Sequence, residues 1–166
     1  MKKYLWILFI AMLPIVELRG AIPFAFAGDM PIVWAYVLSV IGNMIPVPFI
    51  FLFARKILEW GADKKVIGKF FTWCLKKGHN GGEKLKAKSG KGLFFALMIF
   101  VGIPLPVTGA WTGTLAASIL DMDFKQAMLA VLCGVLLAGV IVTVACLGLF
   151  GGIGAIFQGS LPSFLG

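Results

Sequence analysis

Charged residues are scarce in this chain. Only 13% of its 166 residues are Asp, Glu, Lys or Arg, whereas 60% are hydrophobic and the mean hydropathy is +1.00. Soluble domains usually contain about 25% charged and about 45–50% apolar residues. The shortage of charge excludes an ordinary soluble domain and indicates an integral membrane protein, which we expect to form a single membrane domain over residues 1–166.

Residues that hold metals or act as nucleophiles are few as well. The chain has one histidine, His79, and three cysteines whose spacing matches no zinc or CxxC pattern: Cys74, Cys133 and Cys146. No phosphate-binding loop and no nucleophile–base pair stand out. We therefore expect no metal, no cofactor and no enzymatic activity.

Acidic residues are outnumbered by basic ones, seven to 15, and the excess lies in one polar stretch, residues 54–92. Eleven of the Lys and Arg residues and only three acids fall there, so the stretch carries a net charge of +8. This equals the net charge of the whole chain. Short basic loops of membrane proteins stay in the cytoplasm, and this rule explains the charge better than a nucleic-acid partner does. We therefore predict a cytoplasmic linker and no nucleic-acid binding.

Within that linker, apolar residues recur at helical spacing: Val66, Ile67, Phe70, Phe71 and Cys74. This pattern is typical of an amphipathic helix that lies in the lipid interface, with its lysines near anionic headgroups. A helix that covers the protein's own cytoplasmic face fits the same pattern, and both interpretations stay open.

Long apolar runs account for most of the rest. They are Tyr4–Ala27, Pro31–Phe53, Leu93–Leu120 and Gln126–Phe157. The runs form two pairs on either side of the linker. The sequence therefore predicts an all-α fold with a first repeat at 4–53, a basic linker with its interfacial helix at 54–92, and a second repeat at 93–157.

Prolines and glycines interrupt these runs, and proline removes a helical N–H donor and disfavours helix at the preceding residue. We expect helix breaks at Gly20, Pro23, Pro46, Pro48, Pro104, Pro106 and Gly113. Either all four runs span the membrane, or the first and third are re-entrant hairpins that enter from opposite sides. We favour the hairpins, because they make the halves inverted repeats and bring both breaks together near the midplane.

The sequence Glu17-Leu18-Arg19-Gly20 places two full charges inside an apolar run. An ionised group near the bilayer centre costs about 2.5–3.5 kcal/mol, so charges at that depth commonly mark a functional site. We interpret Glu17 as a proton-titrating carboxylate and Arg19 as an anchor for an anionic group. The alternatives are a mutually neutralising pair or charges at a water interface.

Polar residues in the other runs complete the candidate site. Asn43 precedes Pro46 and either bonds to backbone freed by a break or lines the substrate path. Thr108, Gly109, Trp111 and Thr112 follow the break of the third run, where exposed N–H groups and hydroxyls favour an anion. Trp111 is equally compatible with ordinary packing.

Three stretches carry a resemblance to a known family: Glu17–Pro23, Gly42–Pro48 and Phe100–Gly113. Together they resemble the small multidrug export proteins, small prokaryotic membrane proteins that are distantly similar to the DedA/VTT proteins. The resemblance implies two re-entrant hairpins, each followed by a transmembrane helix. The name of the family implies drug efflux. The likeness to the DedA/VTT proteins implies movement of lipids. The arginine of the second DedA hairpin has no counterpart here, because Leu93–Leu120 has no charged residue.

The sequence thus predicts a multi-pass transporter of the prokaryotic cell membrane. The leading hypothesis is a proton-coupled secondary transporter or lipid translocase, with membrane lipids as partners and a small anionic, lipid-phosphate-like amphipathic substrate between the hairpin tips. The alternatives are efflux of cationic amphipathic drugs and a membrane-shaping or assembly factor without transport. We also expect a homodimer, because a second copy would help to enclose the broken helices.

Overall fold

The computed structural model describes residues 2–62, 90–105 and 108–159. Within these ranges every regular element is a helix and no strand occurs, which confirms the all-α prediction. The predicted interfacial helix of the linker and the predicted break at Pro106 lie outside the described residues.

Each half of the chain contains two short helices followed by longer helical sequence. The described part of the first half consists of α1 (Lys2–Met12), α2 (Glu17–Ala27), α3 (Ile32–Met44) and α4 (Pro46–Ala62). The described part of the second half consists of α6 (Gly90–Gly102), α7 (Ala110–Ile119) and α8 (Phe124–Gly159).

Two of the described helical segments are long and apolar enough to cross a membrane: Ile32–Ala54, which combines α3 with the start of α4, and Phe124–Leu149 in α8. The four short helices contain 10 to 13 residues each. At about 1.5 Å per residue they reach about 15–20 Å, or half the hydrocarbon thickness of a bilayer. Neither the first nor the third apolar run is therefore a single spanning helix in this structure.

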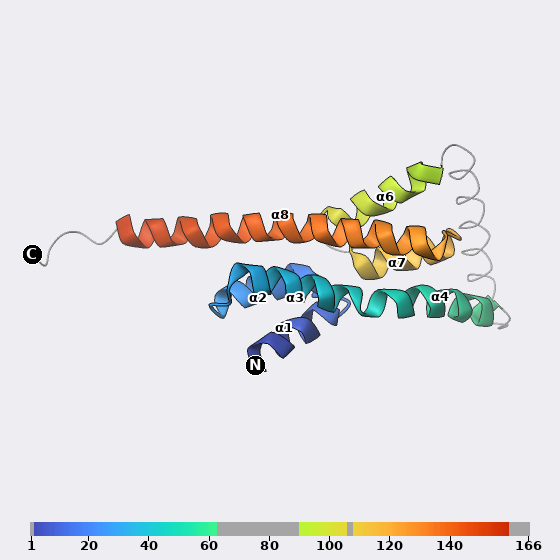
Figure 1. The fold of residues 1–166 in the computed structure, drawn as a ribbon, viewed down its shortest axis with the longest axis horizontal. Coiled ribbons are helices and arrows are strands. Elements are labelled where there is room, and N and C mark those ends of the chain that lie inside the picture. The colour runs from blue at the N-terminus through green and yellow to red at the C-terminus, as the bar shows by residue number, and fades with distance from the viewer. Residues whose placement is uncertain (1, 63–89, 106–107, 160–166) are drawn as a thin grey trace, which may run out of the picture.

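The long segments run side by side in opposite chain directions (Figure 1). In that view α1 and α2 lie beside one end of the pair, whereas α6 and α7 lie toward the other end. Both pairs of short helices turn back near the middle of the molecule. The two helix breaks are thereby brought together, and this junction positions the candidate site.

The two short-helix pairs end in the same local geometry. Asp29 and Asp121 both adopt the left-handed backbone conformation, with φ of 55° and 58°. The N–H of the methionine that follows each aspartate donates to the carbonyl five residues back, at 3.0 Å in the first half and 3.1 Å in the second. These are Schellman caps. The aspartates are 92 residues apart, and so are Ile32 and Phe124, which begin α3 and α8.

Glycines allow the first helix of each half to lie close against the long helix. A Cβ on Gly42 of α3 would lie 2.4 Å from the carbonyl oxygen of Leu8 in α1. A Cβ on Gly134 of α8 would lie 2.7 Å from the carbonyl oxygen of Met98 in α6. These close approaches pack α1 against α3 and α6 against α8.

Three of the predicted helix breaks were wrong. Gly20 and Pro23 lie inside α2, and Gly113 lies inside α7. The first run is interrupted earlier, at Leu13–Val16, because Leu13 precedes Pro14 and such a residue avoids the helical region. Gly113 instead permits close packing: a Cβ there would lie 2.4 Å from Cγ2 of Val101 in α6.

The remaining described prolines lie at or near discontinuities. Pro46 is the first residue of α4, and Pro48 lies within the first turn. An N–H at the first helical position makes no bond within the helix, so proline is tolerated there. Only Ile45 separates α3 from α4. Pro104 lies in the segment that leaves α6.

Candidate functional site where the two helix breaks meet

Glu17 is the first residue of α2, and its side chain reaches the start of α7. The Trp111 N–H donates to Oε1 of Glu17 at 3.1 Å, and a Cβ on Gly109 would lie 2.1 Å from Oε2. Gly109, which precedes α7, supplies no side-chain cap of its own. The carboxylate therefore caps α7 from the other half of the chain, at the helix end that favours an anion.

The backbone of Glu17 is unusual. Its φ is +49°, a conformation that non-glycine residues seldom adopt and that costs about 1–3 kcal/mol. The side chain is 5% exposed, which is rare for a glutamate. Strained backbone conformations of this kind are found mainly at functional sites. The strain and burial of Glu17 therefore mark it as a candidate functional residue.

Arg19, one half-turn further along α2, reaches the end of α6. Its guanidinium donates to the carbonyl oxygens of Leu105 and Ile103, the latter at 3.3 Å, and to Oγ1 of Thr108 at 3.1 Å. The carbonyls beyond a helix C-terminus carry negative partial charge and favour a cation. Glu17 and Arg19 therefore stabilise opposite ends of the same interruption.

The second half of the chain also binds a helix end in the first half, through Trp111. Its indole Nε1–H donates to the carbonyl oxygen of Met12, the last residue of α1, at 3.2 Å. Trp111 thus joins the end of α1 with its side chain and Glu17 with its backbone. Backbone groups at the helix ends would have no water to bind inside a bilayer. Here the Met12 carbonyl and the Trp111 N–H find partners across the junction.

The hydroxyls predicted at the second break lie beside these contacts. Oγ1 of Thr108 lies 2.9 Å from the carbonyl oxygen of Ile103 and 3.0 Å from that of Leu105. Oγ1 of Thr112 lies 3.4 Å from the carbonyl oxygen of Gly109. The structure thus brings together six of the seven predicted site residues: Glu17, Arg19, Thr108, Gly109, Trp111 and Thr112.

A cavity of about 460 Å³ opens at this junction. Its described lining comes from both breaks: Pro14, Ile15, Glu17, Arg19, Pro104, Leu105, Thr108 and Thr112. Its size falls within the range of about 300–1,000 Å³ that is typical of small-molecule sites. Apolar side chains surround one guanidinium, one carboxylate and two hydroxyls, an arrangement suited to an amphipathic molecule.

Asn43 is the predicted residue that stands apart. It is fully buried in α3 and is not among the described residues that line the cavity. Neither polar atom of its amide has a hydrogen-bond partner in the described part of the chain. Ser39, one turn earlier on the same helix face, is likewise buried with an unpartnered hydroxyl. Buried polar groups without partners destabilise a fold by about 1–3 kcal/mol each.

We therefore expect Asn43→Leu, a substitution of similar size, to raise the free energy of unfolding by about 2 kcal/mol, because it removes two buried groups that lack partners among the described residues. The measurement is thermal unfolding of purified protein in detergent, with Ser39→Ala as a smaller change on the same face. Destabilisation by Asn43→Leu would show that the amide makes an essential interaction.

Sequence reasoning missed part of the cavity wall. Ile15 and Leu105 line it, yet an apolar residue in an apolar run carries no distinguishing signal. Pro14 was the available clue, because it sets the first break and thereby exposes Ile15, which is 94% accessible. Among the described residues, no group of three or more His, Cys, Asp or Glu side chains is arranged to hold a metal ion.

Comparison with known proteins supports the resemblance found in the sequence. No curated protein and no solved structure matches this chain. A model of the family described as "Putative small multi-drug export protein" matches residues 17–141, more than half of the chain. The match begins at Glu17 and includes Arg19 and the site residues between Thr108 and Thr112. The chain belongs to this family of small multi-drug export proteins.

Proposed function

We propose that this protein is a membrane transporter whose substrate site is the cavity between the two helix breaks. The family name indicates an export role, and two helical segments are suited to crossing a membrane. The observation that carries the proposal is the cavity itself, which combines apolar walls with the Glu17 and Arg19 side chains. Charges at that depth are otherwise costly.

The membrane arrangement that fits this site has α1–α2 and α6–α7 as re-entrant hairpins, entering from opposite sides of a prokaryotic cell membrane. The halves are then inverted repeats, and the basic linker is cytoplasmic. The opposite directions of the long segments and the matching caps at Asp29 and Asp121 support this arrangement. A homodimer would cover the apolar side chains exposed at the junction, such as Ile15.

The substrate that the cavity suits best is an anionic amphipathic molecule of the lipid-phosphate kind. Glu17 is buried and bound to the start of α7, whereas Arg19 is only half-buried. A guanidinium carries five N–H donors, and three acceptors are identified for it. The charge that the cavity presents to a substrate is therefore positive.

Proton coupling would act through Glu17. When ionised, its carboxylate attracts both the Trp111 N–H and the positive end of α7. When protonated, it loses the attraction to the helix end, and α7 is then held to α2 less strongly. The protonation of Glu17 and the position of α7 are linked in this way. A substrate anion bound to Arg19 would lie in the same cavity as Glu17.

Efflux of a cationic amphipathic drug is the second candidate, and the family's name, which refers to multi-drug export, favours drug efflux. In that case Glu17 would have to leave the start of α7 to pair with the drug. A membrane-shaping or assembly factor that transports nothing is the third.

One experiment separates these candidates. Purified protein in liposomes is assayed for movement of a fluorescent lipid phosphate and of a cationic dye, with empty liposomes as the control. We expect the lipid phosphate to move faster than in empty liposomes and the dye to move at the control rate. Movement of the dye alone would favour drug efflux, and movement of neither would contradict transport.

Glu17→Gln tests the proton's role. Glutamine can still accept the hydrogen bond from the Trp111 N–H, but it carries no charge and does not titrate. We expect transport by the parent to respond to an imposed pH gradient and transport by Glu17→Gln to ignore it, while circular dichroism shows an unchanged helix content. An equal response of both proteins would mean that Glu17 is not the coupling group.

A further inference from the structure

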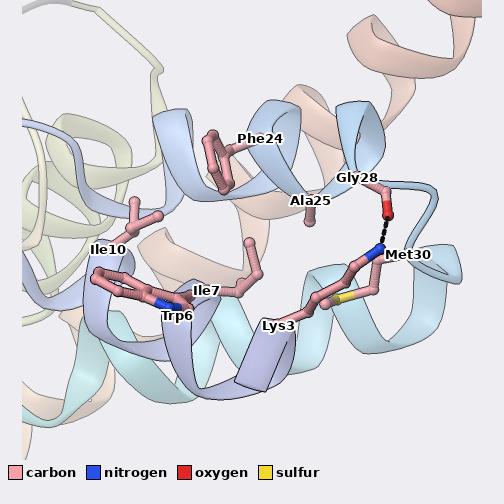
Figure 2. Close-up of a pocket in the computed structure, with 8 residues that line it drawn as sticks. All are labelled: Lys3, Trp6, Ile7, Ile10, Phe24, Ala25, Gly28 and Met30. Carbon is pink, nitrogen blue, oxygen red and sulfur yellow. Dashed lines mark hydrogen bonds between the residues drawn. The ribbon is translucent and has the colours of Figure 1, made fainter. Parts of the chain in front are cut away.

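A second cavity, of about 540 Å³, lies between α1 and α2, away from the junction of the breaks. Figure 2 shows its lining: Lys3 and Gly28 face each other at one end, and Trp6 and Ile10 lie toward the other. None of its described lining residues is shared with the cavity of the proposed transport site. It needs an explanation of its own.

The cavity is amphipathic along its length. Lys3, Trp6 and Ile10 stand at helical spacing on one face of α1, and Phe24 of α2 lies across from them. From Lys3 to Ile10 is about 10 Å along the helix axis, at about 1.5 Å per residue. Lys3 thus stands at one end of a cavity whose other described side chains are apolar, which matches the headgroup and acyl chain of a lipid in polarity.

The cation has unused binding capacity. Nζ of Lys3 donates to the carbonyl oxygen of Gly28, the C-cap of α2, at 3.4 Å. An ammonium group has three N–H donors, and the described residues supply an acceptor for one of them, which leaves two for a ligand. Lys2 and Lys3 also outnumber Asp29 among the charged residues described at this end, so the local field favours an anion.

We propose that this cavity binds an anionic phospholipid of the surrounding membrane, with an acyl chain against Trp6, Ile10 and Phe24 and the headgroup phosphate on Lys3. Charge complementarity and the apolar lining select this occupant. The site goes beyond the proposed transport function, because it needs only that α1 and α2 face lipid. Lipid bound there would hold α1 and α2 together at the ends that lie away from the break between them.

The fluorescence of Trp6 tests the proposal directly. Protein in detergent is titrated with phosphatidylglycerol that carries brominated acyl chains, and with brominated phosphatidylcholine. The Trp6 contribution is obtained by subtracting the quenching seen in Trp6→Phe. We expect stronger Trp6 quenching by the anionic lipid, loss of that preference in Lys3→Gln, and no loss in Lys2→Gln, which removes the same charge from the neighbouring position.

Three results would overturn the proposal: equal quenching by both lipids in the parent, a preference that survives Lys3→Gln, or an equal loss in Lys2→Gln, which would indicate general surface charge. Unchanged far-ultraviolet circular dichroism confirms that each variant folds. The titration involves no transport, so its failure and that of the transport assay are distinguishable.

Discussion

Arg19→Ala is expected to reduce transport to the rate of empty liposomes and to lower the free energy of unfolding by about 2–3 kcal/mol, because hydrogen bonds to a charged donor are lost and their acceptors stay at a partly buried junction. The acceptors are the carbonyls of Ile103 and Leu105 and the hydroxyl of Thr108. The segment between α6 and α7 would lose these hydrogen bonds to α2. Thermal unfolding and the liposome assay measure the two effects.

Arg19→Lys distinguishes charge from geometry. Lysine keeps the charge but lacks the planar fork that reaches several acceptors at once. We expect it to restore part of the stability and little of the transport. Lys125→Ala, which removes an exposed cation at the start of α8, is the control and should behave as the parent. Parent-like transport by Arg19→Ala would remove Arg19 from the site.

Gly109→Ala is expected to have an effect of similar size for a steric reason. The added Cβ would lie 2.1 Å from Oε2 and 2.7 Å from the carboxylate carbon of Glu17, so either the acid or the start of α7 must move. The backbone at Gly109 is extended, which alanine tolerates, so the effect comes from lost space alone. Overpacking of this kind destabilises by about 1–3 kcal/mol.

Gly92→Ala is the matched control, because nothing lies within 4 Å of a Cβ at that position of α6. Alanine is the better helix former, so this variant should be as stable as the parent or slightly more so. Both variants are compared by thermal unfolding and by the liposome assay. If Gly109→Ala unfolds and transports as Gly92→Ala does, then the Glu17 carboxylate does not need its place against α7.

The sequence predicts the helical class well, because long apolar runs are local signals. It predicts the number of breaks less well. Pro23 reads as a helix breaker but lies inside α2, since the chain had already turned at Pro14 and the resumed helix continues through the proline. The caps at Asp29 and Asp121 were missed, although an Ala-x-x-x-Asp-Met pattern recurs there at a spacing of 92 residues.

The candidate site was predictable in composition but not in its contacts. Glu17 and Arg19 draw attention because charge is costly in an apolar run. Their partners lie 84 to 94 residues away, and nothing local in the sequence specifies that pairing. Arg19 was expected to anchor an anionic group, and that role stays a prediction; in the structure its guanidinium holds the end of α6. Only the three-dimensional geometry reveals that contact.

The most direct test of the central claim, that cargo passes through the cavity between the two breaks, is to block that cavity after the protein has folded. Ile15→Cys is made in a protein whose three native cysteines are replaced by alanine, and transport of a fluorescent lipid phosphate is measured before and after reaction with a bulky maleimide. The control is Leu129→Cys, at an exposed position of α8. We predict that modification stops transport at Ile15 and leaves it unchanged at Leu129. Undiminished transport after complete modification of Ile15→Cys would contradict the account.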